Sequence, residues 1–367
     1  MHRQAGRRTT ASARVIADRR QAPSPLVVSV RADLPPADSD AYVRGHAGAT
    51  GYHLRAWTDL IGRVFGHETK YLVADTADGV VGVLPLVFFR SRLFGRFAVS
   101  LPFVNYGGVI ADGPEAERAL LDRAMEETQA AGGTHLELRH TRQLYSDLTP
   151  KRHKVAMVLP LCDTAEHEWE RLDRKVRNQV RKGEKSDLAV VVGGVELVDE
   201  FYSVFAHNMR DLGTPVYTRA LFTDVLTTFR TTSRAFVVRH QGRPVAGSIV
   251  VWHQGTAEVP WASALRSANA LSANVFLYWH MLKFCVEQGL ETFDFGRSTP
   301  NEGTFHFKRQ WGAQPRELVW EYWTASGHAT PNVNPKNPKF DLAIRAWQRL
   351  PLPVASALGP HIVRNIP

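Results

Sequence analysis

The sequence contains only two cysteines, Cys162 and Cys285, among its 367 residues. Two isolated cysteines do not make the disulfide framework of a small secreted domain, so their scarcity favours a reducing compartment. A free cysteine usually packs as a small hydrophobic side chain, and we expect this for both residues rather than a nucleophilic role.

Long hydrophobic runs are also missing. The longest, residues 80–89, is far too short to cross a bilayer as a helix. The amino-terminal segment is basic, but no apolar core follows it, so it lacks the pattern of a secretory signal. We therefore expect a cytoplasmic protein without an integral membrane segment. Such a protein could still contact the inner face of the membrane peripherally.

The motifs of several common active sites are absent. The sequence has no phosphate-binding P-loop, no GxSxG elbow of a hydrolase and no HExxH zinc site. Its histidines are scattered without the spacing of metal ligands, so we expect no metal ion. Asp294 and Glu302 could act as paired carboxylates, although carboxylates at strand ends more often make structural hydrogen bonds.

The composition is that of a soluble globular protein, with 44% hydrophobic and 22% charged residues. The length suits two domains of ordinary size. The formal net charge is +9, but residues 1–20 hold six arginines against one aspartate, so about half of the excess lies in this segment. We expect residues 1–24 to form a disordered basic tail, and the remaining charge does not indicate binding to nucleic acid.

Periodicity predicts the main helices and strands. Apolar residues recur at helical spacing over residues 54–65, and further helices are expected over residues 115–131 and 272–288. Hairpins of two strands are expected over residues 70–89 and 234–252. These hairpins align at an offset of about 164 residues, and the later helices and strands align at about 157, which indicates a tandem duplication.

The duplication predicts two tandem α/β (α+β) units with mixed, largely antiparallel sheets. We place the first unit at residues 25–162 and the second at residues 163–330. Residues 331–367 follow as a carboxyl-terminal extension with one short amphipathic helix, in which Phe340 and Trp347 lie on one side. We expect this helix to pack on a domain in preference to a membrane surface.

Each unit has the order helix, hairpin, third long strand, loop, helix and strand, which is the order of the GNAT acyltransferase fold. In that fold, strands that part around a central loop expose backbone groups for an acyl donor. A glycine-containing loop before the next helix holds the pyrophosphate of coenzyme A, because glycine lets backbone N–H groups approach the ligand. Here that loop, residues 265–274, has no glycine, so coenzyme A is disfavoured.

The stretch over residues 291–312, ETFDFGRSTPNEGTFHFKRQWG, combines a strand, a polar loop and a cation among aromatic residues. Its alternating FDF pattern is typical of a half-buried strand. A second extended piece is expected around Phe305 and Phe307, next to Lys308. A low local dielectric would strengthen the effect of this ammonium group. The alternative is an aromatic hairpin in the core, with Lys308 as a solvated charge at its rim.

Three segments resemble those of the FemAB-type peptidyl transferases, non-ribosomal enzymes built from two GNAT-like units. They are LPFVNYGGVIADG from residue 101, RLDRKVRNQVRKGEKSDL from residue 171 and FDFGRSTPNEGTFHFKRQWG from residue 293. The last carries the family's signature, a phenylalanine-lysine pair followed by an aromatic-glycine pair. More narrowly, NYGG, LGTPVY and FDFGRST resemble the subgroup associated with exosortase and PEP-CTERM exopolysaccharide loci.

The resemblance covers most of the chain and implies transfer of an aminoacyl or acyl group to an amine of a cell-envelope or exopolysaccharide precursor. Aminoacyl-tRNA is the donor in that family. The resemblance places Phe307 and Lys308 at the acyl-transfer centre, where the lysine stabilises the tetrahedral intermediate. Elementary chemistry agrees, because aminolysis of an ester develops an oxyanion that a desolvated ammonium stabilises.

The resemblance also implies substrate-binding residues. Arg177 and Arg181 would hold a phosphate-bearing acceptor or the RNA end of the donor, since arginine donates hydrogen bonds in a planar fork; the pattern alone favours a solvated helix face. Asn105 and Tyr106 match the family's substrate-facing loop, and the alternative is that they cap a tight turn.

Three further candidates lie in the second unit. Arg297 directly follows FDFG and would orient a substrate carboxylate or phosphate; the alternative is an ion pair with Asp294 or Glu302. Asp294 and Trp261 complete the set of substrate-binding candidates.

Two other functions agree with the same residues. An acyl-CoA-dependent GNAT N-acetyltransferase has the same fold order but conflicts with the glycine-free loop. A non-catalytic binding protein of a polysaccharide biosynthesis locus would use the same pocket for recognition alone. The chain also has no sustained heptad run, whereas family members that bind tRNA often carry a coiled-coil arm.

Overall fold

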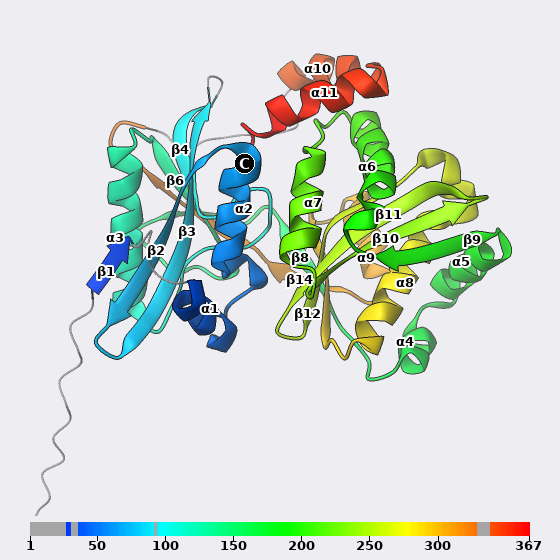
Figure 1. Ribbon diagram of the computed structural model, residues 1–367, viewed down its shortest axis with the longest axis horizontal. Helices are drawn as coiled ribbons and strands as arrows, with labels where there is room; N and C mark the ends of the chain where they lie inside the picture. Colours follow the sequence, from blue (N-terminus) through cyan, green and yellow to red (C-terminus); the bar gives the residue numbers. More distant parts are fainter. Residues whose placement is uncertain (1–26, 31–35, 92–93, 329–337) are drawn as a thin grey trace, which may run out of the picture.

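Two mixed sheets, each with its own helices, stand side by side in the computed structural model (Figure 1). It describes residues 27–30, 36–91, 94–328 and 338–367. The expected amino-terminal tail therefore lies outside the described residues. The expectation of a mixed α/β fold with two sheets is confirmed.

The first unit is built on a sheet with the strand order β1-β2-β3-β4-β6-β15-β7, and β5 pairs with β3. Its strands are β1 (Val27–Val30), β2 (Glu68–Thr76), β3 (Gly79–Ser91), β4 (Gly95–Val99), β5 (Ile110–Ala111), β6 (His135–His140), β7 (Thr149–Lys151) and β15 (Val319–Thr324). Its helices are α1 (Pro36–Gly45), the 3-10 turn η1 (Gly51–His53), α2 (Arg55–Phe65) and α3 (Pro114–Ala130). Helices α2 and α3 cover opposite faces of this sheet, so both faces are shielded from water (Figure 1).

The second unit has a sheet with the strand order β14-β8-β13-β12-β11-β10-β9. Its strands are β8 (Val155–Pro160), β9 (Leu188–Gly193), β10 (Ser233–His240), β11 (Arg243–His253), β12 (Thr256–Ala264), β13 (Thr292–Ser298) and β14 (Gln314–Glu317). Its helical segments are α4 (Ala165–Arg171), α5 (Arg174–Lys185), η2 (Val195–Leu197), α6 (Val198–Leu212), α7 (Arg219–Thr228), η3 (Arg266–Leu271), α8 (Ala273–Glu287) and α9 (Gly303–Arg309).

The two units repeat one plan, as the sequence offset predicts. In each, a hairpin and a third strand are followed by a helix and a strand that pairs in parallel with the third strand: β4 with β6 in the first unit and β12 with β13 in the second. All other strand pairs in the described parts of the chain are antiparallel. The expected hairpins and helices of both units are present at the expected places.

Two strands cross between the units. β8 follows the first unit in sequence but pairs with β13 and β14 of the second sheet. β15 follows the second unit but pairs with β6 and β7 of the first sheet. The expected domain boundary at residue 162 therefore does not coincide with the boundary between the sheets. Each sheet is completed by a strand from the other half of the chain, which ties the units together.

The segment after β13 is a helix, so the expectation of a second extended piece around Phe305 and Phe307 is wrong. Glu302 precedes the helix with an extended backbone, and the helix then runs from Gly303. Phe305 and Lys308 are three residues apart and share its buried face. Alternation of aromatic residues over so few positions fits a helix face as well as a strand, and packing decides between them.

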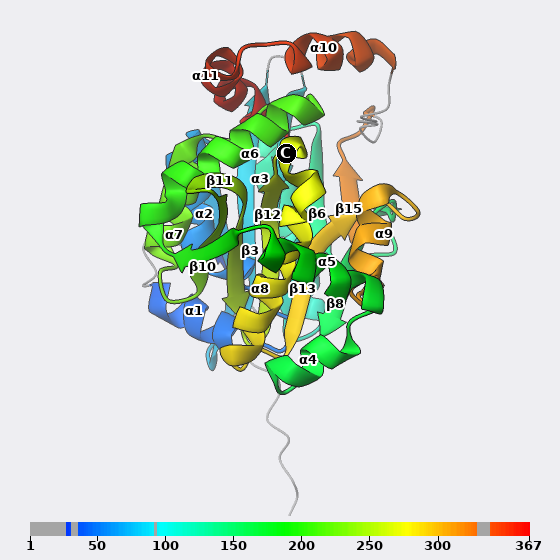
Figure 2. The same cartoon turned by 90° about the vertical axis from the view of Figure 1, so that its right-hand side faces the viewer.

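The carboxyl-terminal segment forms two helices where one was expected. α10 (Pro338–Gln348) and α11 (Leu352–Val363) lie across the end of the molecule next to α6 (Figure 2). The backbone carbonyl of Arg364 is 2.8 Å from Nε2 of His67 at the end of α2, so the segment contacts the first unit as well. Within the described residues, none of the helices has the length and apolar character needed to span a bilayer.

A layer of helices separates the two sheets. α2 of the first unit and α7 of the second lie next to each other between them (Figure 1). The Trp57 ring on α2 stacks on Phe229 after α7, with ring centroids 4.7 Å apart. One buried hydrophobic cluster contains side chains of both sheets and of this layer. The interface is thus packed like a domain core, which favours a fixed arrangement of the two units.

Candidate active site between the two units

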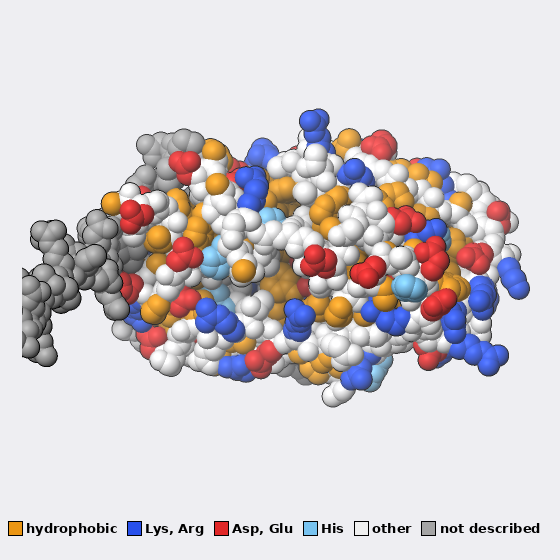
Figure 3. Space-filling model, turned by 90° about the horizontal axis from the view of Figure 1, so that it is seen from below, with side chains coloured by type: hydrophobic (Ala, Val, Ile, Leu, Met, Phe, Trp, Pro, Cys, Tyr) orange, Lys and Arg blue, Asp and Glu red, His pale blue; other side chains and the backbone are white. Residues whose placement is uncertain are grey.

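A cavity of about 470 Å³ lies between the units. Its lining comes from both: the segment before α2 contributes Tyr52, the loop after β4 contributes Tyr106, and β12 and β13 contribute Glu258 and Asp294. Seen from the side on which α1 lies, the molecule has a hollow near its middle, with hydrophobic side chains visible inside it (Figure 3). A cavity with mainly apolar walls and a few convergent polar groups is the usual form of a small-molecule site.

Two carboxyl groups stand together on one wall of this cavity. Glu258 and Asp294 are directly opposed partners in the parallel pair of β12 and β13, so their side chains point to the same face. They are 6% and 4% exposed. Beyond this rung the two strands no longer pair, although β12 continues to Ala264 and β13 to Ser298. The carboxyl pair therefore marks the point at which the central strands of the second unit part.

The first unit supplies hydrogen-bond partners for this pair. Asn105 donates from its side-chain nitrogen to Oε1 of Glu258 at 2.9 Å, and the Tyr106 hydroxyl donates to Oδ2 of Asp294. The backbone N–H of Gly296 donates to Oδ1 of Asp294 at 2.8 Å. Asn105 and Tyr106 were predicted to face the substrate or to cap a turn, and the structure brings them to the carboxyl pair.

Burial changes the acid–base behaviour of the pair. Burial, together with the neighbouring Asp294, raises the pKa of Glu258 to about 8. Burial also raises the pKa of Asp294, against the opposing effects of Tyr106, Gly296 and Lys308. Two carboxylates side by side in an apolar site do not both ionise easily, because each charge disfavours the other. At neutral pH Glu258 thus keeps its proton, and Asp294 binds a proton more readily than a solvated aspartate does.

Lys308 reaches the same region from α9. It is 8% exposed, and Nζ donates to the carbonyl oxygens of Gly296 at 3.0 Å and Arg297 at 2.9 Å. Burial lowers the pKa of Lys308 to about 8, although the charges of Asp294 and Glu258 oppose the shift. An ammonium has three donors, so one remains after the two backbone contacts. Lys308 is therefore a buried cation at the β13 backbone and not a solvated charge, although, like Asn105, it does not line the cavity itself.

The loop that carries Asn105 and Tyr106 is held rigidly. The Arg139 side chain donates to the carbonyl of Val104 before them, and Nε2 of His140 accepts from the N–H of Val109 at 2.9 Å after them. Gly108 packs so closely that a Cβ atom there would lie 2.0 Å from the His140 ring. These contacts explain why the turn is flanked by glycine and why its two polar side chains point at the carboxyl pair.

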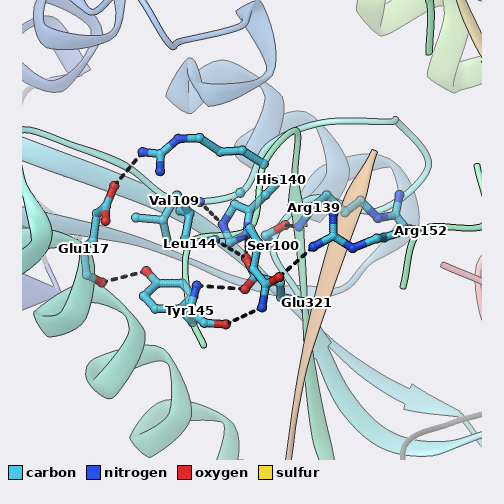
Figure 4. Close-up of polar contacts among 12 residues, drawn as sticks. Ser100, Val109, Glu117, Arg139, His140, Leu144, Tyr145, Arg152 and Glu321 are labelled. Carbon is cyan, nitrogen blue, oxygen red and sulfur yellow. Dashed lines mark hydrogen bonds and ion pairs between the residues drawn. The ribbon is translucent and has the colours of Figure 1, made fainter. Parts of the chain in front are cut away.

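A buried polar network fixes the orientation of His140 (Figure 4). Because Nε2 accepts from Val109, the proton must be on Nδ1, which is 2.7 Å from Oε2 of Glu321 on β15. Glu321 also accepts from the backbone N–H groups of Leu144 and Tyr145. Strand β15, which comes from the second half of the chain, thus positions the loop of the first unit. That loop in turn completes the candidate site of the second unit.

The second partner of the loop is His53. Its Nε2 is 3.1 Å from the carbonyl of Gly108, and its Nδ1 accepts from the N–H of Thr50 at 3.0 Å. Burial lowers the pKa of His53 to about 4. The ring is therefore neutral near pH 7, with its proton on Nε2, and acts as a spacer between the segment before α2 and the loop.

Other predicted residues lie away from the cavity. Phe307 packs against Tyr278 of α8, with ring centroids 5.1 Å apart, and belongs to the core on the far side of the second sheet. Trp261 is buried against Phe222 and does not line the cavity. Both have the packing role of ordinary core residues.

The predicted arginines on α5 also lie outside it. The Arg181 guanidinium lies over the Trp169 ring, 5.5 Å from its centroid. Arg177 is half-buried, and its Nε has no hydrogen-bond partner. Neither residue lines the cavity between the units. Any anion that they bind would occupy a separate place on the second unit.

Arg297 lies between the units, and the alternative considered for it, an ion pair with Asp294 or Glu302, is not formed. Among the described residues it has no ion pair with Asp294 or Glu302. Its guanidinium lies over the Trp320 ring of β15, 5.4 Å from the centroid. Asp294 does have a carboxyl neighbour, but it is Glu258 and not Glu302, the partner considered from the sequence.

Sequence reasoning missed Glu258 and Tyr52. Glu258 is the lone charge in the strand AEVPWASA, and a lone carboxylate within an apolar strand is a signal that could have found it. The Tyr52 hydroxyl is buried beside Glu258, and burial and this charge raise the pKa of Tyr52. Nothing in the local pattern around Tyr52 indicates this placement.

The loop before α8 is the position at which GNAT enzymes bind pyrophosphate. Here it winds into η3, and its N–H groups are engaged internally: Ala268 donates to Leu265 at 3.0 Å and Ser272 donates to Asn269 at 3.0 Å. Ser272 has a positive φ of 62° without being glycine. The chain therefore offers no open set of backbone donors at these two positions of the loop.

Comparisons with known proteins identify relatives of the same fold. Residues 170–309 match the family described as acetyltransferase (GNAT) domain. Solved structures similar to the chain include FemX, with a TM-score of 0.63, 15% identity and coverage of 80% of this chain and 96% of that one. L-PGS from Bacillus licheniformis has a TM-score of 0.54 and 13% identity, and the match covers 86% of this chain and 98% of that one.

The C-terminal domain of a putative lysylphosphatidylglycerol synthetase from Agrobacterium fabrum has a TM-score of 0.53 and 13% identity. This match covers 79% of this chain and 91% of that one. No curated protein matches the sequence. At these identities the solved structures establish the fold alone. Two GNAT-like units in tandem make up the chain, and the second contains the segment that matches a GNAT acetyltransferase domain.

Proposed function

We propose that this protein is an acyltransferase that moves an aminoacyl or acyl group from an activated ester to an amine, in the cavity between the two units. The observation that carries the proposal is the buried pair of Glu258 and Asp294, which stands with Lys308 where β12 and β13 part. This place in a GNAT unit is where the acyl group would enter between the strands. A proton acceptor and a buried cation are the groups that aminolysis of an ester needs.

The carboxyl pair acts as the general base. The amine nitrogen attacks the carbonyl carbon of the donor, and its proton passes to the ionised carboxylate of the pair. When the carbon–oxygen bond of the ester breaks, the leaving oxygen takes the proton that the pair already holds. Raised pKa values suit both steps, because a group with a pKa near the working pH can accept and return a proton.

Lys308 stabilises the negative charge that develops on the carbonyl oxygen. Its two hydrogen bonds to the carbonyls of Gly296 and Arg297 hold the ammonium in place before the reaction, so little reorganisation is needed. In this proposal the remaining donor serves the developing oxyanion. This assigns Lys308 the role that the sequence suggested, with Phe307 as its packing neighbour rather than a reacting group.

The proposed donor and acceptor are supported by the sequence resemblance and by the similar proteins. FemX and L-PGS share the fold, and an aminoacyl-tRNA donor with an acceptor of the cell envelope or of an exopolysaccharide precursor fits a chain of this kind. The subgroup resemblance favours an exopolysaccharide locus of the exosortase and PEP-CTERM type. A cytoplasmic protein that works at the inner face of the membrane would meet both substrates.

The proposal is tested by transfer of label. Purified protein is incubated with a pool of tRNA charged with 14C-amino acids and with an extract of envelope and polysaccharide precursors. We expect protein-dependent label in an acid-stable, RNase-resistant product, and no such product with Glu258→Gln. Equal labelling by wild type and Glu258→Gln would remove the carboxyl pair from the mechanism.

An acetyl-CoA-dependent N-acetyltransferase is the second candidate, because the matched segment belongs to a GNAT acetyltransferase domain. The occupied N–H groups of Ala268 and Ser272 argue against it, since a pyrophosphate would find neither of them free. Calorimetry with acetyl-CoA separates the two. Micromolar binding, with transfer of labelled acetate to an amine in the same extract, would replace the aminoacyl donor in the proposal.

A further inference from the structure

The carboxyl-terminal helix α11 carries large apolar side chains on its outside. Val354, Leu358 and Ile362 are 41%, 47% and 38% exposed. They recur every four residues, so they form one stripe about 12 Å long, here called the α11 stripe. The buried side of the helix has no room for large residues, because a Cβ atom at Gly359 would lie 2.8 Å from the backbone nitrogen of Val216. A helix that served only the core would have the reverse arrangement.

Helix α10 adds an outer face that is both apolar and basic. Its inner side packs at the end of α6, where Ile344 lies against Gly213. Its outer side presents Leu342, which is 79% exposed, together with Arg345 and Arg349 at helical spacing. Within the described part of the chain, the side chains of these two arginines make no ion pair or hydrogen bond. Both helices lie across one end of the molecule, so their outer sides face away from the two sheets (Figure 2).

A groove of about 820 Å³ opens beside the end of the α11 stripe. His361 and Arg364 line it from the carboxyl-terminal segment, and Arg90 and Glu68 line it from the first unit. His361 lies three residues after Leu358, so the groove borders the stripe. Glu68 accepts from Arg90 at 2.8 Å, whereas the Arg364 guanidinium makes no hydrogen bond or ion pair to a described residue. The groove therefore offers an arginine fork that is available to an anion.

The charges around these apolar side chains are positive. Residues 342–367 contain three arginines and no aspartate or glutamate. A second copy of the chain is a poor occupant, because a symmetric dimer through this face would bring the same arginines of both copies together. A stable protein interface also buries about 800 Å² on each partner, far more than one stripe of half-exposed side chains offers. An anionic membrane surface needs no matching groove and accepts apolar side chains and arginines together.

We propose that α10 and α11 form a docking surface for a bilayer that contains anionic phospholipids. The α11 stripe and Leu342 enter the boundary between the headgroups and the acyl chains. Arg345 and Arg349 approach the lipid phosphates, and the groove at Arg364 holds the phosphate of one headgroup. Apolar burial and charge attraction thus act on the same surface, as they do in other helices that lie in a membrane interface.

This surface lies away from the opening of the cavity between the units. α10 and α11 are at the end of the molecule next to α6, whereas the hollow is seen from the side of α1 (Figure 1 and Figure 3). A chain docked in this way keeps its cavity open to water. The surface therefore anchors the protein and does not pass lipid into the cavity. It goes beyond acyl transfer, and vesicle binding can be measured without any donor or acceptor.

Vesicle flotation with the full-length protein tests the proposal. Vesicles of phosphatidylcholine mixed with phosphatidylglycerol are compared with vesicles of phosphatidylcholine alone. We expect wild type to prefer the anionic vesicles, with binding that weakens as salt is added. Val354→Thr combined with Ile362→Thr should weaken binding by about tenfold, because less apolar surface enters the bilayer. Arg345→Gln combined with Arg349→Gln should weaken it by about tenfold or more, because two charges near the surface are lost.

Two double variants provide matched controls. Val192→Thr combined with Val195→Thr changes two valines that are 43% and 45% exposed on the second unit, far from α11 in sequence. Arg230→Gln combined with Arg243→Gln removes two exposed arginines of the same unit. Both proteins should bind vesicles as wild type does. The substituted side chains are exposed in every variant, so all should fold, and matching urea unfolding curves would verify this.

Three results would overturn the proposal. The first is a wild type that does not bind anionic vesicles. The second is equal binding by wild type and by the variants of α10 and α11, which is expected if the arginines of residues 1–20 alone attract the vesicles. The third is a wild-type dimer in analytical ultracentrifugation that Val354→Thr with Ile362→Thr dissociates, because the surface would then serve a second copy of the chain.

Discussion

Lys308 is the residue with which the proposed chemistry can be tested most directly. Lys308→Ala removes the buried cation, and we expect kcat to fall by about 10²–10³-fold, the usual loss for one oxyanion donor. The same change leaves the carbonyls of Gly296 and Arg297 without a donor, so stability should fall by about 1–3 kcal/mol. The measurements are steady-state transfer and urea unfolding.

Lys283→Ala is the matched control for that experiment. Lys283 is an exposed lysine on α8 with an ion pair to Glu287 at 3.8 Å, and its loss should change neither quantity much. If Lys308→Ala keeps the kcat of wild type while its unfolding curve moves, Lys308 holds β13 in place and takes no part in the reaction.

Glu258 should make stability depend on pH. Its pKa is raised from 4.5 to about 8 in the folded state, so the folded chain retains a proton that the unfolded chain releases above about pH 4.5. The stabilisation that the retained proton gives the folded state is fully present below about pH 4.5 and is lost as the pH rises through about 8. A tenfold difference in proton affinity between the two states corresponds to about 1.4 kcal/mol, so the free energy of unfolding should fall by several kcal/mol over this range.

Glu258→Gln isolates this effect, because glutamine stays neutral and keeps the shape of the protonated acid. Urea unfolding from pH 5 to pH 9 should show a steeper fall in the free energy of unfolding for wild type than for the variant. Parallel curves for the two proteins would mean that Glu258 ionises normally and cannot share a proton with Asp294.

At the scale of elements, the loop after β4 is what connects the first unit to the chemistry of the second. Gly108→Ala would place a Cβ atom 2.0 Å from the His140 ring and 2.9 Å from the carbonyl of Arg139. We expect the loop to shift, with a loss of about 1–3 kcal/mol in stability and a loss of activity, because Asn105 and Tyr106 would leave the carboxyl pair. Thermal unfolding and transfer assays measure both.

Gly45→Ala provides the comparison, since a Cβ atom at Gly45 would meet nothing within 4 Å. This variant should keep both stability and activity. A Gly108→Ala protein with unchanged stability would show that the loop yields without cost, and the proposed coupling between Gly108 and Asn105 would then be wrong.

The same elements show what a sequence can and cannot predict. The hairpins, long helices and duplication were predictable, because each depends on local period and on self-similarity. α9 was not, since its Phe305 and Phe307 alternate over too short a span to separate helix from strand. Glu258 was missed for a different reason. Its partner Asp294 lies 36 positions later, and only the register of β12 against β13 brings the two together.

The crossing of β8 and β15 also lies beyond local pattern. The sequence of neither strand indicates which sheet it joins. Lys308, Asn105 and Tyr106 became candidates because a family resemblance added distant information; the structure brings them near the carboxyl pair, and their roles stay predictions. Arg177 and Arg181, which depended on that resemblance too, lie elsewhere on α5.

At the scale of the whole molecule, the exchanged strands should make the two units unfold as one. Removing structure from the first sheet frees β15, and β15 is continuous in sequence with β14 of the second sheet. β8 links the units in the opposite direction. One hydrophobic cluster with side chains from both units adds to this coupling. We therefore expect a single cooperative transition, in contrast to a chain of two independent domains.

A cavity in the core of one unit tests this coupling. Leu138→Ala on β6 empties a fully buried position in the first unit, and Leu282→Ala on α8 does the same in the second. Each should cost about 2–5 kcal/mol. If the units unfold together, hydrogen exchange measured by mass spectrometry will show the same loss of protection in β3 and in β11 for either variant. Loss of protection confined to the unit that carries the substitution would mean that the exchanged strands separate while each sheet persists, and that the site between the units can open without global unfolding.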